Sequence, residues 1–476
     1  MLKFQTAPDD PPYNYICRAY HKPDQTCEID DIFLLGPEYK EKYISSLPRF
    51  LFPYSSNQIQ SDTNFSFCLT DTDKNPSYVF AYTSYSKVKD IYYVYAIISE
   101  YFHPEFLKEV IFNVALTYET NSSFCQSYTE YFSKISLTQT PFDWFYNESN
   151  RIYSASNNHA KLLEHYRFLS PMNEIGSLLK YMVSNFSAHY LLSMIVSMMN
   201  DYRIIILSAS PENLGMTSYG LLSLIYPIKW SGSFIPILPN NLDAYLDSPI
   251  AYIDGVHSSF ADVLLRKGMG SYFVINADLH DASLVETEDF PADIQNVIDP
   301  TAEKIKEVSR SYNKIFPAAK IRHILLKFVA KIYGTLYQVN WKSPNDVYEQ
   351  YNFYRRDIGE EMRSTISQTQ FTQQFFENTM EEGDDKIFKM YWPNEERPES
   401  SNNKLDKSEK VEIAGKHESK TSVRRATRHF IDIDKIEVSD MSDENYVSLS
   451  NDSSMICQEN GQNPDLFQFD MGTEDD

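Results

Sequence analysis

The side chains best suited to chemistry in this sequence do not follow the spacing of common catalytic sites. The chain has no G-x-x-x-x-G-K-[ST] phosphate loop, no H-E-x-x-H pair and no G-x-S-x-G nucleophile turn. His159 and His165 are six residues apart, which is the wrong spacing for one helical face. Carboxylate pairs occur throughout a chain with 66 acidic residues, so none is assigned to acid–base catalysis. We therefore expect no covalent catalysis, no metal site and no cofactor.

The cysteines favour a reducing compartment. Their number is odd and none forms a C-x-x-C pair, which argues against a disulfide framework or a zinc finger. They are Cys17, Cys27, Cys68, Cys125 and Cys457. The first residues lack the order of a signal peptide, and the longest apolar stretch, Tyr190 to Met199, is far below the ~20 residues that cross a bilayer. We expect a soluble cytoplasmic protein.

The charge of the chain limits its partners. Asp plus Glu number 66 and Lys plus Arg number 43 among 476 residues, so the formal net charge is −23. Phosphate-rich surfaces require basic faces, so we expect no nucleic-acid partner and no direct binding to a bare anionic membrane. The net charge does not exclude a local basic patch. Hydrophobic residues make up 42% of the chain, which is enough to bury a core in most of it.

The N-terminal part, residues 13–135, has the pattern of a small antiparallel sheet followed by a helix. Phe65–Thr70 and Tyr78–Tyr82 alternate around a cluster of turn formers, which predicts a β-hairpin. Ile91–Ile98 hardly alternates and predicts a strand buried on both faces. His103-Pro104-Glu105 marks a helix start. Residues 1–12 are polar and proline-rich, and we expect a loose end there.

After a Ser/Thr/Asn-rich linker at 136–165, residues 166–300 alternate between helix and strand. The pattern predicts a helix over about 173–199 with a break near Asn185, and another helix from Ser210 to about Tyr226. Strands are expected at Arg203–Ser208, Pro249–Val256 and Tyr272–Asn276. This order indicates an α/β layer.

The remaining chain divides into a helical part and a polar tail. Ile321, Leu325, Phe328, Ile332 and Leu336 fall on one helical face within residues 301–390, and Phe371, Phe375 and Phe376 mark a second helix. Beyond these, residues 391–476 contain 20 acidic and 10 basic side chains. Such a segment cannot bury enough apolar surface to offset the entropy of ordering, so we expect a disordered acidic tail.

A family resemblance appears at Leu221–His257. The stretch contains Tyr226-Pro227, Trp230, Ile235-Pro236-Ile237-Leu238-Pro239 and then Pro249, Tyr252, Gly255 and Val256. This succession resembles the central module of DENN-domain proteins, and within them is closest to the connecdenn type. Upstream, Leu47–Pro53 and Phe65–Asp71 look like the N-terminal module of that family, and Val274–Asp278 resembles the strand that follows. The resemblance covers about residues 13–390.

The resemblance implies an α/β fold in three modules. They are a longin-like N-terminal module (uDENN, 13–135), a central α/β DENN module (cDENN, 166–300) and a helical C-terminal module (dDENN, 301–390). It also implies guanine nucleotide exchange on a Rab-family small GTPase, which would sit in a groove between the first two modules. Candidate contacts are polar groups at strand ends, namely Tyr252, Asp254, His257, Asn276 and Asp278.

Two positions depart from the family pattern. Asp254 stands where the family usually has an apolar residue, and Ala251 stands where it has proline. A buried carboxylate without a partner is costly, so we expect Asp254 to face the groove or to lie at an exposed strand end. The departure leaves open which GTPase is bound and whether exchange is retained.

An exchange factor needs no nucleophile, because it acts by binding the nucleotide-free GTPase more tightly than the loaded form. Scaffold proteins also lack catalytic motifs. The alternatives are therefore a DENN-fold scaffold, a coat-associated adaptor, or a partner that stimulates GTP hydrolysis through an arginine. Arg49 and Arg266 are the candidates for such an arginine.

The tail contains two short patterns. Leu466-Phe467-Gln468-Phe469-Asp470 resembles a clathrin box, with apolar anchors at alternate positions of an extended peptide and acidic neighbours. We therefore expect clathrin to bind at Leu466, Phe467, Phe469 and Asp470. Clathrin adaptors are expected as further partners. Arg424-Arg425-Ala426-Thr427 resembles a basophilic kinase site, with Thr427 as the acceptor. We expect peripheral attachment to clathrin-coated vesicles or endosomes through partners. Whether the tail inhibits the folded part is left open.

Overall fold

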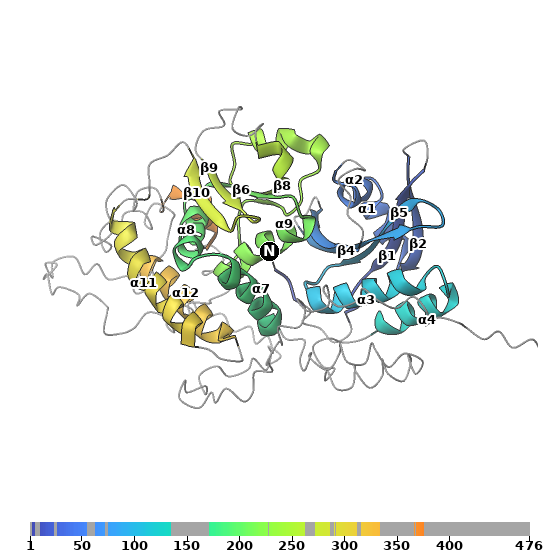
Figure 1. Ribbon diagram of the computed structural model, residues 1–476, viewed down its shortest axis with the longest axis horizontal. Helices are drawn as coiled ribbons and strands as arrows, with labels where there is room; N and C mark the ends of the chain where they lie inside the picture. Colours follow the sequence, from blue (N-terminus) through green and yellow to red (C-terminus); the bar gives the residue numbers. More distant parts are fainter. Residues whose placement is uncertain are drawn as a thin grey trace, which may run out of the picture.

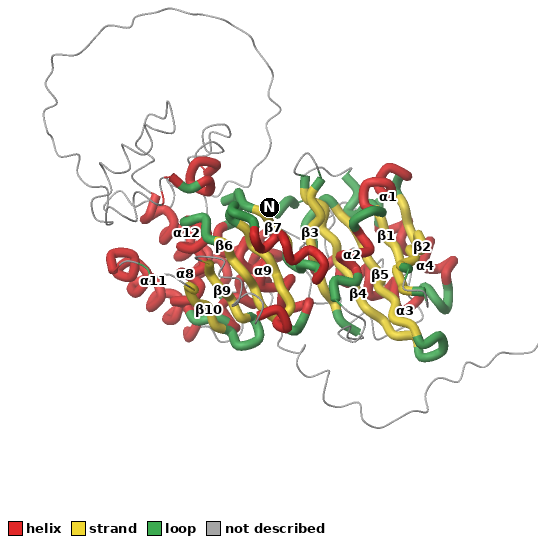
Figure 2. The backbone as a smooth tube through the Cα atoms, turned by 90° about the horizontal axis from the view of Figure 1, so that it is seen from above, coloured by secondary structure: helices red, strands yellow, loops and turns green. Residues whose placement is uncertain are grey.

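The computed structural model describes the chain in segments between Leu2 and Phe375. These are residues 2–4, 10–22, 26–54, 62–71, 75–134, 171–226, 228–261, 272–285, 290, 292–311, 316–333, 366 and 368–375. The predicted linker 136–165 and tail 391–476 lie outside them, as do Arg266, Leu336, Phe376, Thr427 and the clathrin-box residues. Within the described segments, the chain forms two sheets flanked by helices (Figures 1 and 2).

The N-terminal module is built on a five-stranded antiparallel sheet in the order β2-β1-β5-β4-β3. Its strands are β1 (Tyr15–His21), β2 (Cys27–Leu34), β3 (Asn64–Thr70), β4 (Pro76–Ser86) and β5 (Ile91–Ser99). Its helices are α1 (Pro37–Tyr43), α2 (Leu47–Leu51), α3 (Pro104–Thr117) and α4 (Ser122–Phe132). The expected hairpin is confirmed, with Phe65 paired to Ala81, and so are the buried strand β5 and the helix that begins at Pro104. The likeness to a longin fold stays a prediction.

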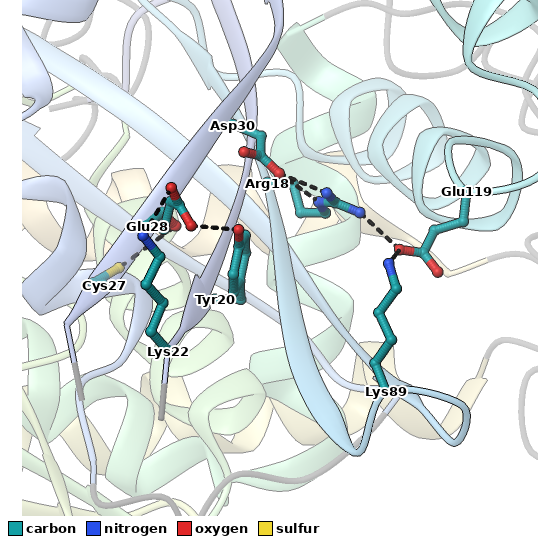
Figure 3. A network of polar contacts seen from close by, with 8 residues as sticks. All are labelled: Arg18, Tyr20, Lys22, Cys27, Glu28, Asp30, Lys89 and Glu119. Carbon is teal, nitrogen blue, oxygen red and sulfur yellow. Dashed lines mark hydrogen bonds and ion pairs between the residues drawn. The ribbon is translucent and has the colours of Figure 1, made fainter. Parts of the chain in front are cut away.

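Strands β1 and β2 were not predicted, because acidic side chains interrupt the apolar pattern of β2. Asp30 of β2 pairs with Arg18 of β1, which also contacts Glu119 just after α3 (Figure 3). Asp30 accepts a hydrogen bond from Nε of Arg18 at 3.1 Å, and Glu119 accepts one from Nη1 at 2.7 Å. The guanidinium carbon lies 4.5 Å from the centre of the Tyr93 ring. Arg18 is thus compensated within the chain and stabilises the edge of the sheet.

The central module contains the second sheet, in the order β10-β9-β6-β8-β7. All neighbouring strands are parallel except β10, which is antiparallel to β9. Its elements are α7 (Pro171–Asn185), α8 (Ala188–Met199), β6 (Arg203–Ser208), α9 (Pro211–Ile225), β7 (Ser233–Ile235), η2 (Asn240–Asp247), β8 (Tyr252–His257), η3 (Ser258–Phe260), β9 (Tyr272–Asn276) and β10 (Asp281–Val285). The α/β alternation and the helix break near Asn185 are confirmed. The strand expected from Pro249 begins at Tyr252 instead.

Helices α11 (Ala292–Ser311) and α12 (Ala318–Tyr333) pack beside α8 and α7. The predicted boundary at residue 300/301 falls inside α11. A short segment around Phe371 also returns to the central module. Its ring lies 6.1 Å from that of Trp230, and the carboxylate of Asp201 accepts the backbone N–H of Phe371 at 3.1 Å.

The first residues are not the loose end that their composition predicted. Leu2 and Phe4 are buried, the N–H of Lys3 donates to the Tyr78 hydroxyl at 2.9 Å, and its carbonyl accepts from Phe102 N–H at 2.6 Å. Figure 1 places this end of the chain between the two modules. The apolar residues at positions 2 and 4 are too few to give a periodic pattern, so only tertiary contacts revealed their burial.

The two modules share one continuous apolar core. Helix α9 contacts β6 and β8 of its own sheet and β3 of the other. Tyr219 of α9 packs its ring 4.8 Å from Phe102 and 6.4 Å from Tyr78. Gly215 lies so close to β3 that an added Cβ would stand 2.9 Å from the carbonyl oxygen of Ser66. The absence of a side chain at this position lets helix and strand approach.

Candidate functional site

The carboxyl ends of three parallel strands meet at one edge of the central sheet. Strands β6, β8 and β9 end at Ser208, His257 and Asn276, which are neighbours across the sheet. In open α/β sheets, this edge is where ligands and partners bind. We define the strand-end surface as His257, Asn276, Asp278 and Leu279, and the buried Ser208 supports it through its contact with Asp278.

Asp278 holds together the turn that leads from β6 into α9. Its carboxylate accepts hydrogen bonds from the Ser208 hydroxyl and from the Ala209 N–H, the latter at 2.7 Å. The side-chain amide of Asn213 lies 3.5 Å away. A strand-to-helix turn with a helix N-terminus is where α/β proteins cradle phosphate. Here a carboxylate of the chain itself occupies that anion position, so this turn suits a protein contact better than a phosphate ligand.

Asn276 rigidifies the turn after β9. Its Oδ1 accepts the backbone N–H groups of Asp278 at 3.1 Å and Leu279 at 3.0 Å. His280 follows with φ of 57° and packs its ring 5.9 Å from Phe186. Leu279 between them is 71% exposed. A large apolar side chain is thus exposed to solvent on a turn whose backbone is held by the hydrogen bonds to Asn276.

His257 joins the strand-end surface to the N-terminal module. Its ring lies 4.8 Å from that of Tyr54, which follows α2. Nδ1 accepts the N–H of Ser259 at 3.2 Å, which places the proton of the neutral ring on Nε2. Partial burial lowers the pKa of His257, and the charge of Asp278 opposes this shift. The backbone N–H of Asn240 also donates to the Pro53 carbonyl at 3.0 Å, so the modules meet along this edge.

Tyr252 and Asp254 do not belong to this surface. Both are 1% exposed, and the Tyr252 hydroxyl donates to the carbonyl of Leu246 in η2 at 3.1 Å. The expectation that Asp254 faces a groove or an exposed strand end is therefore wrong. Its side chain lies within the second apolar cluster, on the same face of the sheet as Tyr252 and Val256. Burial raises its pKa to about 8.

Comparison with known proteins shows which domain family this sequence matches. The DENN (AEX-3) domain matches residues 91–280. A DENN domain is therefore present in this chain. It is 23% identical to human DENN domain-containing protein 1B over 286 residues, which cover 54% of this chain and 35% of that protein. It is 22% identical to mouse DENN domain-containing protein 1A over 302 residues, covering 62% of this chain and 28% of the relative.

The match confirms the resemblance to DENN-domain proteins of the connecdenn type that the motif at Leu221–His257 indicated. The chain spans about a third of the length of these curated relatives. The DENN match begins at β5 and ends in the turn after β9, so it includes the whole strand-end surface.

The structure brings together three of the five predicted contacts, namely His257, Asn276 and Asp278. Sequence reasoning missed Ser208, Tyr54 and Leu279. Ser208 ends a predicted parallel strand, so the same rule that selected His257 and Asn276 could have selected it. Leu279 was missed because an isolated leucine after a strand carries no exposure signal. Arg49 is exposed on α2.

Two further features concern the described segments only. No helix among them is long and apolar enough to pass through a bilayer. No group of three or more metal-ligating side chains comes together in those same segments.

Proposed function

We propose that this DENN-domain protein is a guanine nucleotide exchange factor that promotes GDP release from a Rab-family small GTPase. The observation that carries the proposal is the strand-end surface, which lies where the two modules meet. Its turns are held by Asn276 and Asp278, and Leu279 offers an apolar anchor. The family assignment supports the same partner class, because DENN proteins of the connecdenn type act as Rab exchange factors.

The proposed mechanism requires differential affinity and no covalent step. An exchange factor accelerates release when its complex with the empty GTPase is more stable than its complex with the loaded one. A rigid surface serves this purpose because little ordering entropy opposes binding. The hydrogen bonds to Asn276 and Asp278 provide that rigidity before the partner arrives.

Location and recruitment form a second part of the proposal. The resemblance to connecdenns and the sequence Leu466–Asp470 favour a role in endocytic trafficking, with the tail binding clathrin or its adaptors. Membrane association would then be peripheral and indirect. Phosphorylation at Thr427 would reduce the positive charge beside Arg424 and Arg425. These residues lie outside the described segments, so the argument for them rests on their sequence.

The decisive experiment measures release of mant-GDP from a panel of purified Rab GTPases in the presence of the full chain. We expect acceleration of one or a few members. Binding without acceleration would replace the proposal with a DENN-fold scaffold or a docking adaptor. Faster phosphate release from GTP-loaded GTPase would instead indicate stimulation of hydrolysis.

The role of the strand-end surface is tested by Leu279→Ser. Truncating a central apolar anchor of an interface costs about 2 kcal/mol, so we expect exchange on the responsive GTPase to fall about tenfold or more. The matched control is Val88→Ser, since Val88 is 95% exposed but lies on the β4–β5 turn. Thermal unfolding of both variants should match the parent. Equal exchange by the two variants would remove Leu279 from the contact surface.

A further inference from the structure

Tyr226 lies where three parts of the described chain meet. It ends α9 in the central module and opens the Tyr226-Pro227 pair of the long motif. The ring of Phe4, from the N-terminal segment (residues 2–4), lies 5.9 Å from the Tyr226 ring and stands at 87° to it. The guanidinium carbon of Arg322, from α12, lies 5.3 Å from the centre of the same ring. One tyrosine ring therefore contacts both the N-terminal segment and α12.

The N-terminal segment is fixed to the N-terminal module by its backbone. The N–H of Lys3 donates to the Tyr78 hydroxyl at 2.9 Å, and the Lys3 carbonyl accepts the N–H of Phe102 at 2.6 Å. The Phe4 ring also packs edge-on against the ring of Phe102, with centroids 6.1 Å apart. Since these bonds hold the segment to one module, the contact of Phe4 with Tyr226 ties that module to the other.

The two contacts on the Tyr226 ring should depend on each other. An edge-to-face aromatic pair and a guanidinium over a ring are both attracted by the charge distribution of the ring, and the attraction is stronger where water is excluded. Phe4 is 8% exposed, and Tyr226 and Arg322 are half-buried. Loss of one contact would admit water to the ring and weaken the other contact.

The two modules also meet at the opposite end of α9. This helix has 15 residues and is about 22 Å long, and it begins beside the strand-end surface. There the backbone N–H of Asn240 in the central module donates to the Pro53 carbonyl at 3.0 Å, and the ring of Tyr54 lies 4.8 Å from that of His257. The Asn240 amide therefore reports how the modules are aligned, at a place that Tyr226 does not touch.

We propose that Tyr226 is a positioning residue, which together with Phe4 and Arg322 forms a three-part lock. The lock fixes the alignment of the N-terminal and central modules, and with it the shape of the strand-end surface at the far end of α9. The consequence for a GTPase rests on the function proposed above. The lock itself consists of contacts within the chain and does not depend on that function.

The reach of the lock is tested by hydrogen–deuterium exchange of the full chain, with overlapping peptides that isolate the Asn240 amide. Phe4→Leu keeps an apolar side chain but removes the ring. We expect exchange of the Asn240 amide to rise about threefold or more, because its acceptor belongs to the other module. Phe124→Leu is the matched control, since Phe124 packs against Tyr128 within α4, and it should leave this amide unchanged.

The coupling of the two contacts is tested by a double-mutant cycle read out as Tm. Arg322→Gln removes the cation, and Phe4→Leu removes the ring. Because loss of either contact weakens the other, the double variant should lose less Tm than the sum of the two single losses. In a Tyr226→Leu background the two losses should become additive. Tyr226→Phe keeps the ring and should behave like the parent.

Two results would overturn the proposal. One is an Asn240 amide that exchanges in Phe4→Leu as it does in the parent, which would reduce Phe4 to local packing. The other is additive Tm losses in the cycle with Tyr226 present. Neither readout uses a GTPase, so a parent protein that fails to accelerate mant-GDP release would count against the proposed function and leave the lock standing.

Discussion

Asp254 places an ionisable carboxyl group among apolar side chains. It lies on β8 among apolar side chains beneath η2, and its Oδ1 finds no hydrogen-bond partner within the described segments. Burial favours the neutral form and raises the pKa of Asp254 to about 8, although an interaction with the backbone N–H of Ile235 opposes the shift. The sequence predicted that Asp254 faces a groove or lies at an exposed strand end. Both expectations were wrong, because η2 packs over this part of β8 and the sequence did not predict that packing.

We predict that Asp254→Asn stabilises the protein increasingly as the pH rises. The folded pKa is raised, so the stability of the protonated form is full below about pH 3.8 and is lost as the pH approaches 8. The resulting cost in the parent at pH 9 is on the order of 5 kcal/mol. Thermal unfolding should show a higher Tm for the variant at pH 8.5, with a smaller difference at pH 5.

Asp281→Asn provides the control for that measurement, since Asp281 is an exposed acid on β10 of the same sheet. Its Tm should follow that of the parent at every pH. A pH-independent Tm difference for Asp254→Asn would show that the carboxyl does not titrate in the folded protein.

At the scale of elements, α9 is the helix that joins the two sheets. Sequence reasoning located it correctly, from the Ser210-Pro211 start to a C-terminus near Tyr226. Its buried side chains extend around most of its circumference, and the reason is visible only in the structure, where one side faces β6 and β8 and another faces β3. Strands β1 and β2, in contrast, were missed from the sequence. Acidic side chains, which Arg18 and tyrosines compensate in the structure, interrupt their apolar pattern.

We predict that Gly215→Ala destabilises the protein, although alanine is normally better than glycine in a helix by about 1 kcal/mol. The new Cβ would stand 2.9 Å from the backbone oxygen of Ser66, so α9 and β3 must separate. Overpacking of this kind costs about 1–3 kcal/mol. Urea unfolding followed by circular dichroism measures the loss.

Gly176→Ala in α7 is the matched control, because its Cβ would meet only the Cβ of Ala318 at 3.3 Å. Its free energy of unfolding should stay within about 1 kcal/mol of the parent. If both variants behaved alike, the close approach of α9 to β3 would not limit the packing of the two modules.

The whole molecule combines a folded part with a tail whose proposed role is recruitment. The proposal assigns the partner GTPase to the strand-end surface and the coat proteins to the tail, so the two activities should be separable. Variants in one part are expected to leave the other unaffected, because the clathrin-box pattern is a short extended peptide that needs no folded support.

We predict that Leu466→Ala combined with Phe469→Ala abolishes capture of the clathrin terminal propeller by the immobilised full chain. The two side chains are the alternate apolar anchors of the pattern, and losing both should lower capture at least about tenfold. Leu449→Ala changes a leucine of the same tail outside the pattern and should bind like the parent. Capture that survives the double substitution would exclude the box, while mant-GDP release should be the same for all three proteins.

The sequence alone determined most helices and strands of the central sheet and the presence of a DENN domain, because apolar periodicity, turn residues and a long motif are local signals. The long motif from Tyr226 to Val256 was specific enough to identify the DENN domain. The tertiary structure decided which polar residues reach solvent. Tyr252 and Asp254 are buried under η2, Leu279 is exposed, and Glu174 meets α3 across the junction. Tyr252 contacts a segment only six residues away and Glu174 contacts one about 70 residues away, but both contacts depend on how the elements pack, which apolar periodicity does not report.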